Sequence, residues 1–140
     1  MTEQSRILHE ILERTKAHCK DGGVFKAVFD LDSTLFDVNP RVRRILQSFA
    51  EIDAVQSKFP EASRLLTSPE LNLKNTYKLK DQMIHIGLTT EKPEFYTQLL
   101  EFWKTHFFGN DFIHHDEPYE GAIEYVKEIY EAGAHVYYLT

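Results

Sequence analysis

The chain has 140 residues, of which 42% are apolar and 27% are charged, and its formal net charge is −6 at pH 7. This length suits one ordinary domain, and the negative charge argues against nucleic acid or an anionic membrane as a partner, because both usually bind basic patches. No stretch is apolar enough for a membrane span or a secretory signal, and a single cysteine, Cys19, excludes an internal disulfide, so we expect a cytoplasmic protein.

The first predicted elements are a helix and a strand. Apolar residues recur at helical spacing in the first turns of the chain, and the pair Gly22–Gly23 ends the helix. Residues 24–29 are a β-branched and aromatic run, which predicts a strand buried on both faces, as in a parallel sheet. Asp30 then falls at the C-terminal end of this strand.

Residues 38–116 are predicted to be helical almost throughout. Asn39–Pro40 is a start signal, with the asparagine as N-cap and the proline at the first helical position, and Ser68–Pro69 repeats it. The last helix of this segment begins near residues 90–93 and ends at Gly109. It is apolar nearly all round, so we expect it to be buried or to cover something.

The end of the chain returns to an alternation of helix and strand. Residues 116–118 supply an acidic cap and a first-turn proline for a helix that Gly133 ends. Residues 135–139 then predict a second buried strand, which closes on Thr140. The order helix, strand, helical insertion, helix, strand predicts an α/β fold.

Both predicted strands deliver polar residues at their C-terminal ends, where open parallel sheets bind ligands. The first offers Asp30, Asp32, Ser33 and Thr34, and the second offers Thr140. Of two nearby carboxylates, one can act as a nucleophile and the other as an acid and base. Their mutual repulsion is offset by a divalent cation, and such oxygen ligands suit Mg²⁺. The cation would also neutralise a phosphoryl group, which the N–H groups of the turn would cradle.

The two aspartates have other interpretations. A calcium-binding EF-hand loop counted from Asp30 needs glycine at its sixth position and an acid at its twelfth, but these are Leu35 and Arg41. Paired glycosidase acids usually come from separate elements. A structural role, in which Asp30 and Asp32 cap a turn, stays open.

Two segments resemble the haloacid dehalogenase-like hydrolases. The segment FDLDSTL is similar to the first motif of that family, D-x-D-x-[TV] after an apolar strand. The segment PYEGAIEYVKEIYEAGAHVYYLT is similar to the approach to the second motif, in which a strand ends in Ser or Thr. The resemblance covers residues 24–37 and 116–140, whereas the helical middle matches only by position.

For the fold, the resemblance implies a Rossmann-like parallel-sheet core, of which only the first part is present, with an inserted all-helical cap. Residues 1–37 and 117–140 would form the partial core, and residues 38–116 would form the cap. For the function, it implies a Mg²⁺-dependent phosphatase that hydrolyses a small phosphorylated metabolite, because a closing cap would exclude polymers.

The resemblance also assigns roles to single residues. Asp30 would attack phosphorus to form an aspartyl-phosphate, and Asp32 would protonate the leaving alcohol and then activate water. Asp30 and the main-chain carbonyl of Asp32 would hold Mg²⁺. Leu31, Asp32, Thr34 and Thr140 would bind the phosphoryl group. The second aspartate favours phosphoryl transfer over dehalogenation.

Two later motifs of the family, a lysine or arginine and an acidic cluster, do not occur before Thr140. We therefore expect a fragment of a longer hydrolase, with natural truncation or completion by a partner chain as alternatives. The strand at 24–29 would expose a sheet edge and favour self-association. A non-catalytic domain that binds phosphate or a partner protein, and a phosphomutase, stay open as other functions.

Two polar groups near the ends of the helical segment are weaker candidates. Arg41, Arg43 and Arg44 either bind a phosphorylated substrate or form the solvated face of a cap helix. Residues 114–117, His-His-Asp-Glu, have the composition of a metal site, although the polarity of a hinge explains them as well.

Overall fold

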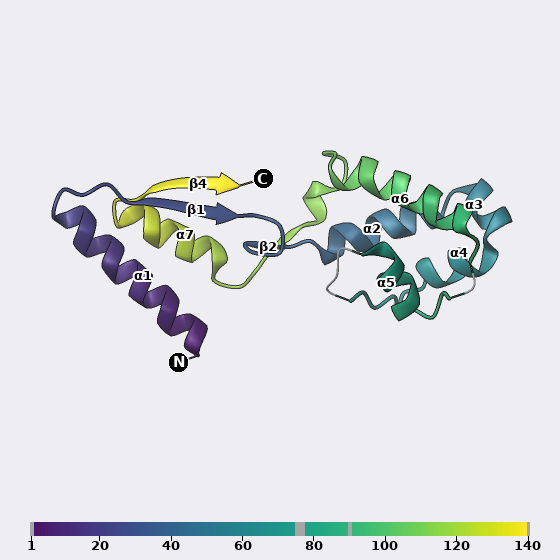
Figure 1. The fold of residues 1–140 in the computed structure, drawn as a ribbon, viewed down its shortest axis with the longest axis horizontal. Helices are drawn as coiled ribbons and strands as arrows, with labels where there is room; N and C mark the ends of the chain where they lie inside the picture. The colour runs from purple at the N-terminus through teal and green to yellow at the C-terminus, as the bar shows by residue number, and fades with distance from the viewer. Residues whose placement is uncertain (1, 75–77, 90, 140) are drawn as a thin grey trace. The chain divides into compact units, whose positions relative to one another are not determined.

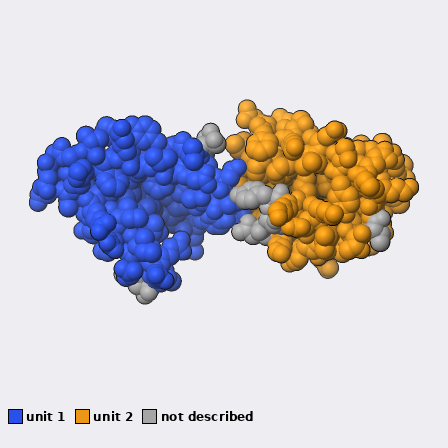
Figure 2. Space-filling model, viewed as in Figure 1, with its two compact units in different colours: residues 1–37, 117–140 blue, residues 38–116 orange. Residues whose placement is uncertain are grey.

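The computed structural model describes residues 2–74, 78–89 and 91–139. The chain has a mixed α/β fold and divides into two compact units, which we call unit 1 (residues 1–37 and 117–140) and unit 2 (residues 38–116; Figure 2). These bounds are the ones expected for the partial core and the helical insertion. The roles of core and cap stay predictions. Thr140, predicted to bind a phosphoryl group, lies outside the described residues.

The elements follow the order shown in Figure 1. Unit 1 contains α1 (Glu3–Lys20), β1 (Lys26–Asp30), β2 (Phe36–Asp37), β3 (Glu117–Pro118), α7 (Ala122–Glu131) and β4 (His135–Leu139). Unit 2 contains α2 (Asn39–Ala50), α3 (Asp53–Lys58), α4 (Pro60–Leu66), α5 (Leu79–His85), α6 (Pro93–Phe107) and the short 3₁₀ helix η1 (Ile113–His115). Within the described ranges, no helix is both long and apolar enough to cross a membrane.

Strands β1 and β4 form a parallel pair, as predicted, but they are not buried on both faces. Residues pair from Lys26 with His135 to Asp30 with Leu139. One face packs on α1 and α7, through a cluster built on Leu12 and Ile129 (Figure 1). Side chains on the other face are exposed, and Val28 remains 65% exposed. The expectation of two buried faces was wrong because the described helices of unit 1 cover only one of them.

The helix before the second strand begins later than predicted. Residues 117–118 form β3, which pairs antiparallel with β2, instead of capping α7. The main-chain N–H of Tyr119 then donates to the carbonyl oxygen of Leu35 at 2.9 Å. Gly121, with φ +77°, is the N-cap of α7. The sheet pairing of residues 117–118 therefore replaces the predicted helix start.

Unit 2 is built on the buried faces of α2, α4 and α6. Its largest fully buried side chains are Ile45, Leu46, Leu66, Met83, Leu88, Phe95 and Leu99. On α6 the buried residues are four apart, from Phe95 to Phe107, whereas Leu100 is 41% exposed. The helix therefore buries one face and covers the core of unit 2 with it, which is the second of the two expected outcomes, and it is not buried all round.

The two predicted start signals in unit 2 differ in outcome. Helix α2 starts at Asn39, but its N-cap is Val38, one residue earlier than predicted, and Pro40 lies in the first turn. Ser68–Pro69 starts no helix and lies in a turn, where the Ser68 hydroxyl accepts a hydrogen bond from the N–H of Glu70 at 3.2 Å. Serine and proline are as common in turns as at helix starts, so this pattern alone does not separate the two.

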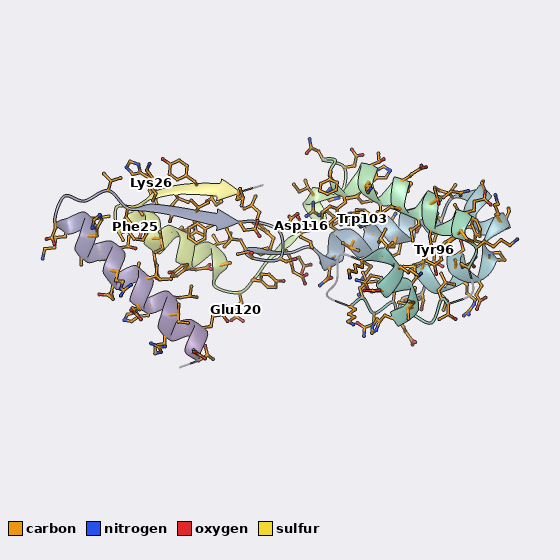
Figure 3. The ribbon with its side chains drawn as sticks, viewed as in Figure 1. Phe25, Lys26, Tyr96, Trp103, Asp116 and Glu120 are labelled. Carbon is orange, nitrogen blue, oxygen red and sulfur yellow. The ribbon has the colours of Figure 1, made fainter. Side chains whose placement is uncertain are left out.

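A buried ion pair ties the two ends of unit 2 together. Arg41 Nε lies 2.9 Å from Asp116 Oδ1, and the two side chains are 4% and 9% exposed (Asp116 is labelled in Figure 3). Arg41 Nη1 also donates to the carbonyl oxygen of Phe107 at 3.1 Å, and the guanidinium lies 4.2 Å from the centre of that ring. Arg41 therefore joins α2 to the segment after α6, so the expectation of a solvated face was wrong for this residue.

We predict that Asp116→Ala destabilises unit 2 by about 3–5 kcal/mol, because it leaves the buried Arg41 charge without its partner. The free energy of unfolding would be measured by urea denaturation, followed by the fluorescence of Trp103, a residue of unit 2. The matched control is Glu51→Ala, which breaks the exposed pair between Arg44 and Glu51 and should cost less than about 1 kcal/mol. Equal effects of the two substitutions would contradict the prediction.

Candidate functional site

Asp30 is the last residue of β1 and lies at the carboxyl end of the parallel pair, in register with Leu139. Its side chain is exposed, and the Thr34 hydroxyl donates to Asp30 Oδ2 at 2.9 Å. This hydrogen bond fixes the orientation of the carboxylate. The structure therefore brings together two of the predicted site residues, Asp30 and Thr34.

The turn after Asp30 is held by its own main-chain hydrogen bonds. The carbonyl oxygen of Leu31 accepts from the N–H groups of Thr34, Leu35 and Phe36 at 3.3, 3.0 and 3.0 Å. The N–H of Ser33 donates to the carbonyl oxygen of Phe36 at 2.8 Å. Because the N–H groups of residues 33–36 bond within the turn, they are not directed at a ligand. The assignment of phosphate binding to Leu31 and Asp32 stays a prediction.

Ser33 adopts a left-handed backbone conformation, with φ +60°. It is the one non-glycine residue with positive φ in the described part of the chain. Such a conformation costs an L-residue free energy and is often found at functional sites. It reverses the chain between Asp32 and Thr34, which lets the Thr34 hydroxyl return to Asp30.

Asp30 and Asp32 are suitable in kind for Mg²⁺, although the described residues contain no group of three or more His, Cys, Asp or Glu side chains placed to hold a metal. Magnesium is commonly held by one or two carboxylates, with water and substrate phosphate completing its shell. The exposed Asp30 carboxylate and the partly exposed Asp32 fit this pattern. Within the described residues, 114–117 are not placed as a group of three or more metal-ligating side chains, and Asp116 pairs with Arg41.

Sequence reasoning missed an open cleft of about 950 Å³ in unit 1, beside the turn that follows β1. It is lined by residues of α1 and α7 and by residues 33–35 of the turn. The Tyr125 hydroxyl donates to the carbonyl oxygen of Leu8 at 2.9 Å and thereby ties the two helices. Burial, and then the nearby Glu128 carboxylate, raises the pKa of Tyr125. No local pattern marks this cleft, since its walls are far apart in the chain.

Comparison with known proteins adds no relative. Neither a family model, nor a curated protein, nor a solved structure matches this chain. Membership in the haloacid dehalogenase-like family therefore rests on the two motifs and stays a prediction.

We predict that Ser33→Gly is more stable than Ser33→Ala by about 1 kcal/mol, because only glycine adopts positive φ without a steric cost. Both variants lack the hydroxyl, so their difference isolates the backbone conformation. The free energy of unfolding would be measured by urea denaturation, followed by the amide NMR signals of β1 and β4. Equal stability of Ser33→Ala and Ser33→Gly would contradict the left-handed backbone conformation at this position.

Proposed function

We propose that this chain carries the first part of a Mg²⁺-dependent phosphatase of the haloacid dehalogenase-like type, with a Rossmann-like core in unit 1 and a helical cap in unit 2. The substrate would be a small phosphate monoester. The observation that carries the proposal is the carboxylate of Asp30, which lies at the carboxyl end of a parallel strand and is oriented by Thr34.

The position of Asp30 suits a nucleophile. It is exposed at the strand end, so a substrate can reach it, and the hydrogen bond to Oδ2 leaves Oδ1 as the atom that we expect to attack phosphorus. The new bond joins Oδ1 to phosphorus while the bond from phosphorus to the ester oxygen breaks. The product of this first step is an aspartyl-phosphate and an alkoxide that needs a proton.

Asp32 is the candidate acid and base, because it lies in the turn two residues beyond the nucleophile. In the first step it would give its proton to the leaving oxygen. In the second step it would take a proton from water, which attacks phosphorus and releases phosphate and the Asp30 carboxylate. Bound Mg²⁺ would neutralise part of the phosphoryl charge throughout.

We predict that Asp30→Asn abolishes Mg²⁺-dependent release of phosphate from p-nitrophenyl phosphate, because the amide is a poor nucleophile. The assay would be run on two samples. One is the 140-residue chain, and the other is the protein as purified from its natural source. The control is Asp21→Asn, which removes an exposed carboxylate of unit 1 at the end of α1 and should leave turnover unchanged. Unchanged turnover in Asp30→Asn would refute the assignment of Asp30 as the nucleophile. If both protein samples bind phosphate but show no turnover, the alternative of a non-catalytic domain is favoured.

We predict that Asp32→Ala lowers kcat by about 10²–10⁴-fold, the usual contribution of general acid–base catalysis. The loss should be smaller with a substrate whose leaving group needs no proton, such as p-nitrophenyl phosphate, than with an alkyl phosphate. Steady-state kinetics with both substrates would measure it. A change confined to KM would rule out the acid–base role.

A further inference from the structure

The main chain of Tyr119 links three parts of unit 1. Its N–H donates to the carbonyl oxygen of Leu35 at 2.9 Å, and its own carbonyl oxygen accepts from the N–H of Ala122 at 3.0 Å. Leu35 lies in the turn that follows β1, and Ala122 is the first residue of α7. Tyr119 itself directly follows β3. One residue therefore connects the turn of the candidate site to residues 117–119, the return segment by which the chain re-enters unit 1.

The hydrogen bond from Tyr119 to Leu35 extends the short ladder between β2 and β3. The ladder contains two residue pairs, and in one of them Pro118 lies opposite Phe36. Proline has no N–H, so Pro118 cannot donate a hydrogen bond to β2. Tyr119 is the next residue with a main-chain donor, and its acceptor Leu35 lies one residue before β2. The return segment therefore holds the turn itself as well as β2.

Asp32 is held through the residues that Tyr119 holds. Asp32 forms a β-bridge with Phe36, and the N–H of Ser33 donates to the carbonyl oxygen of Phe36 at 2.8 Å. Leu35, directly before Phe36, has a buried side chain and accepts the hydrogen bond from Tyr119. A shift of residues 35–36 would therefore carry Asp32 with it.

Asp30 and Thr34 have a different support. Asp30 is paired with Leu139 in the parallel ladder, and the Thr34 hydroxyl donates to the Asp30 carboxylate. The N–H of Thr34 donates to the carbonyl oxygen of Leu31, the residue that follows β1. The candidate nucleophile is thus placed by β1 and β4, whereas the candidate acid and base is placed by the return segment.

We propose that Tyr119 is a positioning residue, whose main-chain N–H holds Asp32, through residues 35–36, where Asp32 can exchange a proton with the substrate. The proposal rests on the proposed function and deepens it, because it gives the acid and base a support separate from that of the nucleophile. Correct placement matters because a displacement of about 1 Å can cost about 10²-fold in rate.

Two substitutions at Tyr119 isolate the hydrogen bond, because Tyr119→Pro removes the N–H whereas Tyr119→Ala removes the ring and keeps the N–H. A residue before proline favours extended backbone, and Pro118 lies in β3, so the first substitution suits the local conformation. Tyr119→Pro should lower kcat for an alkyl phosphate by about 10²-fold relative to Tyr119→Ala. The loss should be smaller for p-nitrophenyl phosphate, whose leaving group needs no proton. Equal losses for both substrates would indicate a general structural defect and would overturn the proposal.

A double-mutant cycle with Asp32→Ala tests whether Tyr119 acts through Asp32. In the Asp32→Ala background, Tyr119→Pro should lower kcat by less than about threefold, because no carboxylate remains to be misplaced. Steady-state kinetics of the two single variants and the double variant would measure this difference. Additive losses would show that Tyr119 acts on the site by another route, and would overturn the assignment.

Amide hydrogen exchange of the 140-residue chain supplies a readout that needs no turnover. In Tyr119→Pro the Ser33 N–H should exchange roughly tenfold faster than in Tyr119→Ala, while the amides of β1 and β4 keep their protection. If Tyr119→Pro does not fold, the α-hydroxy acid analogue of tyrosine at position 119 replaces the N–H by oxygen and keeps the ring, and the same comparison is made with it.

The exchange measurement separates this proposal from the phosphatase itself. Equal exchange at Ser33 in the variants with and without the N–H would overturn the role of Tyr119, whatever the turnover. Faster exchange at Ser33, together with no turnover in either protein sample, would refute the phosphatase and with it the catalytic part of the proposal, while the support of the turn by Tyr119 would stand.

Discussion

The parallel pairing of β1 with β4 is the interaction on which unit 1 depends. It joins two short strands from opposite ends of the chain, and each contributes side chains to the apolar cluster that packs against α1 and α7. It also fixes where β1 stops, because the register ends with Asp30 beside Leu139. Without this ladder there is no carboxyl end at which Asp30 and the following turn are presented together.

Much of the fold could be predicted from local patterns. Both long strands, the start of α2 to within one residue, and α6 were readable because glycines, prolines and apolar spacing act over a few residues. The errors arose where distant residues decide the outcome. No residue near Glu117 in the sequence indicates that Glu117 pairs with Asp37. Because of this pairing, residues 117–118 form a strand and not the predicted start of α7. The exposure of Val28 is a second such error, because it depends on whether helices from other parts of the chain cover one face of the sheet or both.

The candidate site shows the same division. The pattern around Asp30 and Asp32 was enough to predict a carboxylate at a strand end with a hydroxyl beside it, because strand, turn and hydroxyl are adjacent in sequence. The pattern was not enough to predict which main-chain N–H groups form hydrogen bonds within the turn, or that Ser33 adopts a positive φ. Arg41 was misread for a related reason, since its partner Asp116 lies at the other end of unit 2.

The two-residue pairing of β2 with β3 has a consequence for how such a chain could arise. The polypeptide leaves unit 1 after Asp37 and returns at Glu117, and these two residues are direct neighbours in the antiparallel ladder. Neighbouring exit and entry points are what tolerant sites of domain insertion share, because a segment of almost any length closes between them at little entropic cost. Unit 2 is therefore inserted in the chain between two paired strands, so recombination could exchange it while the strand that presents Asp30 is left intact.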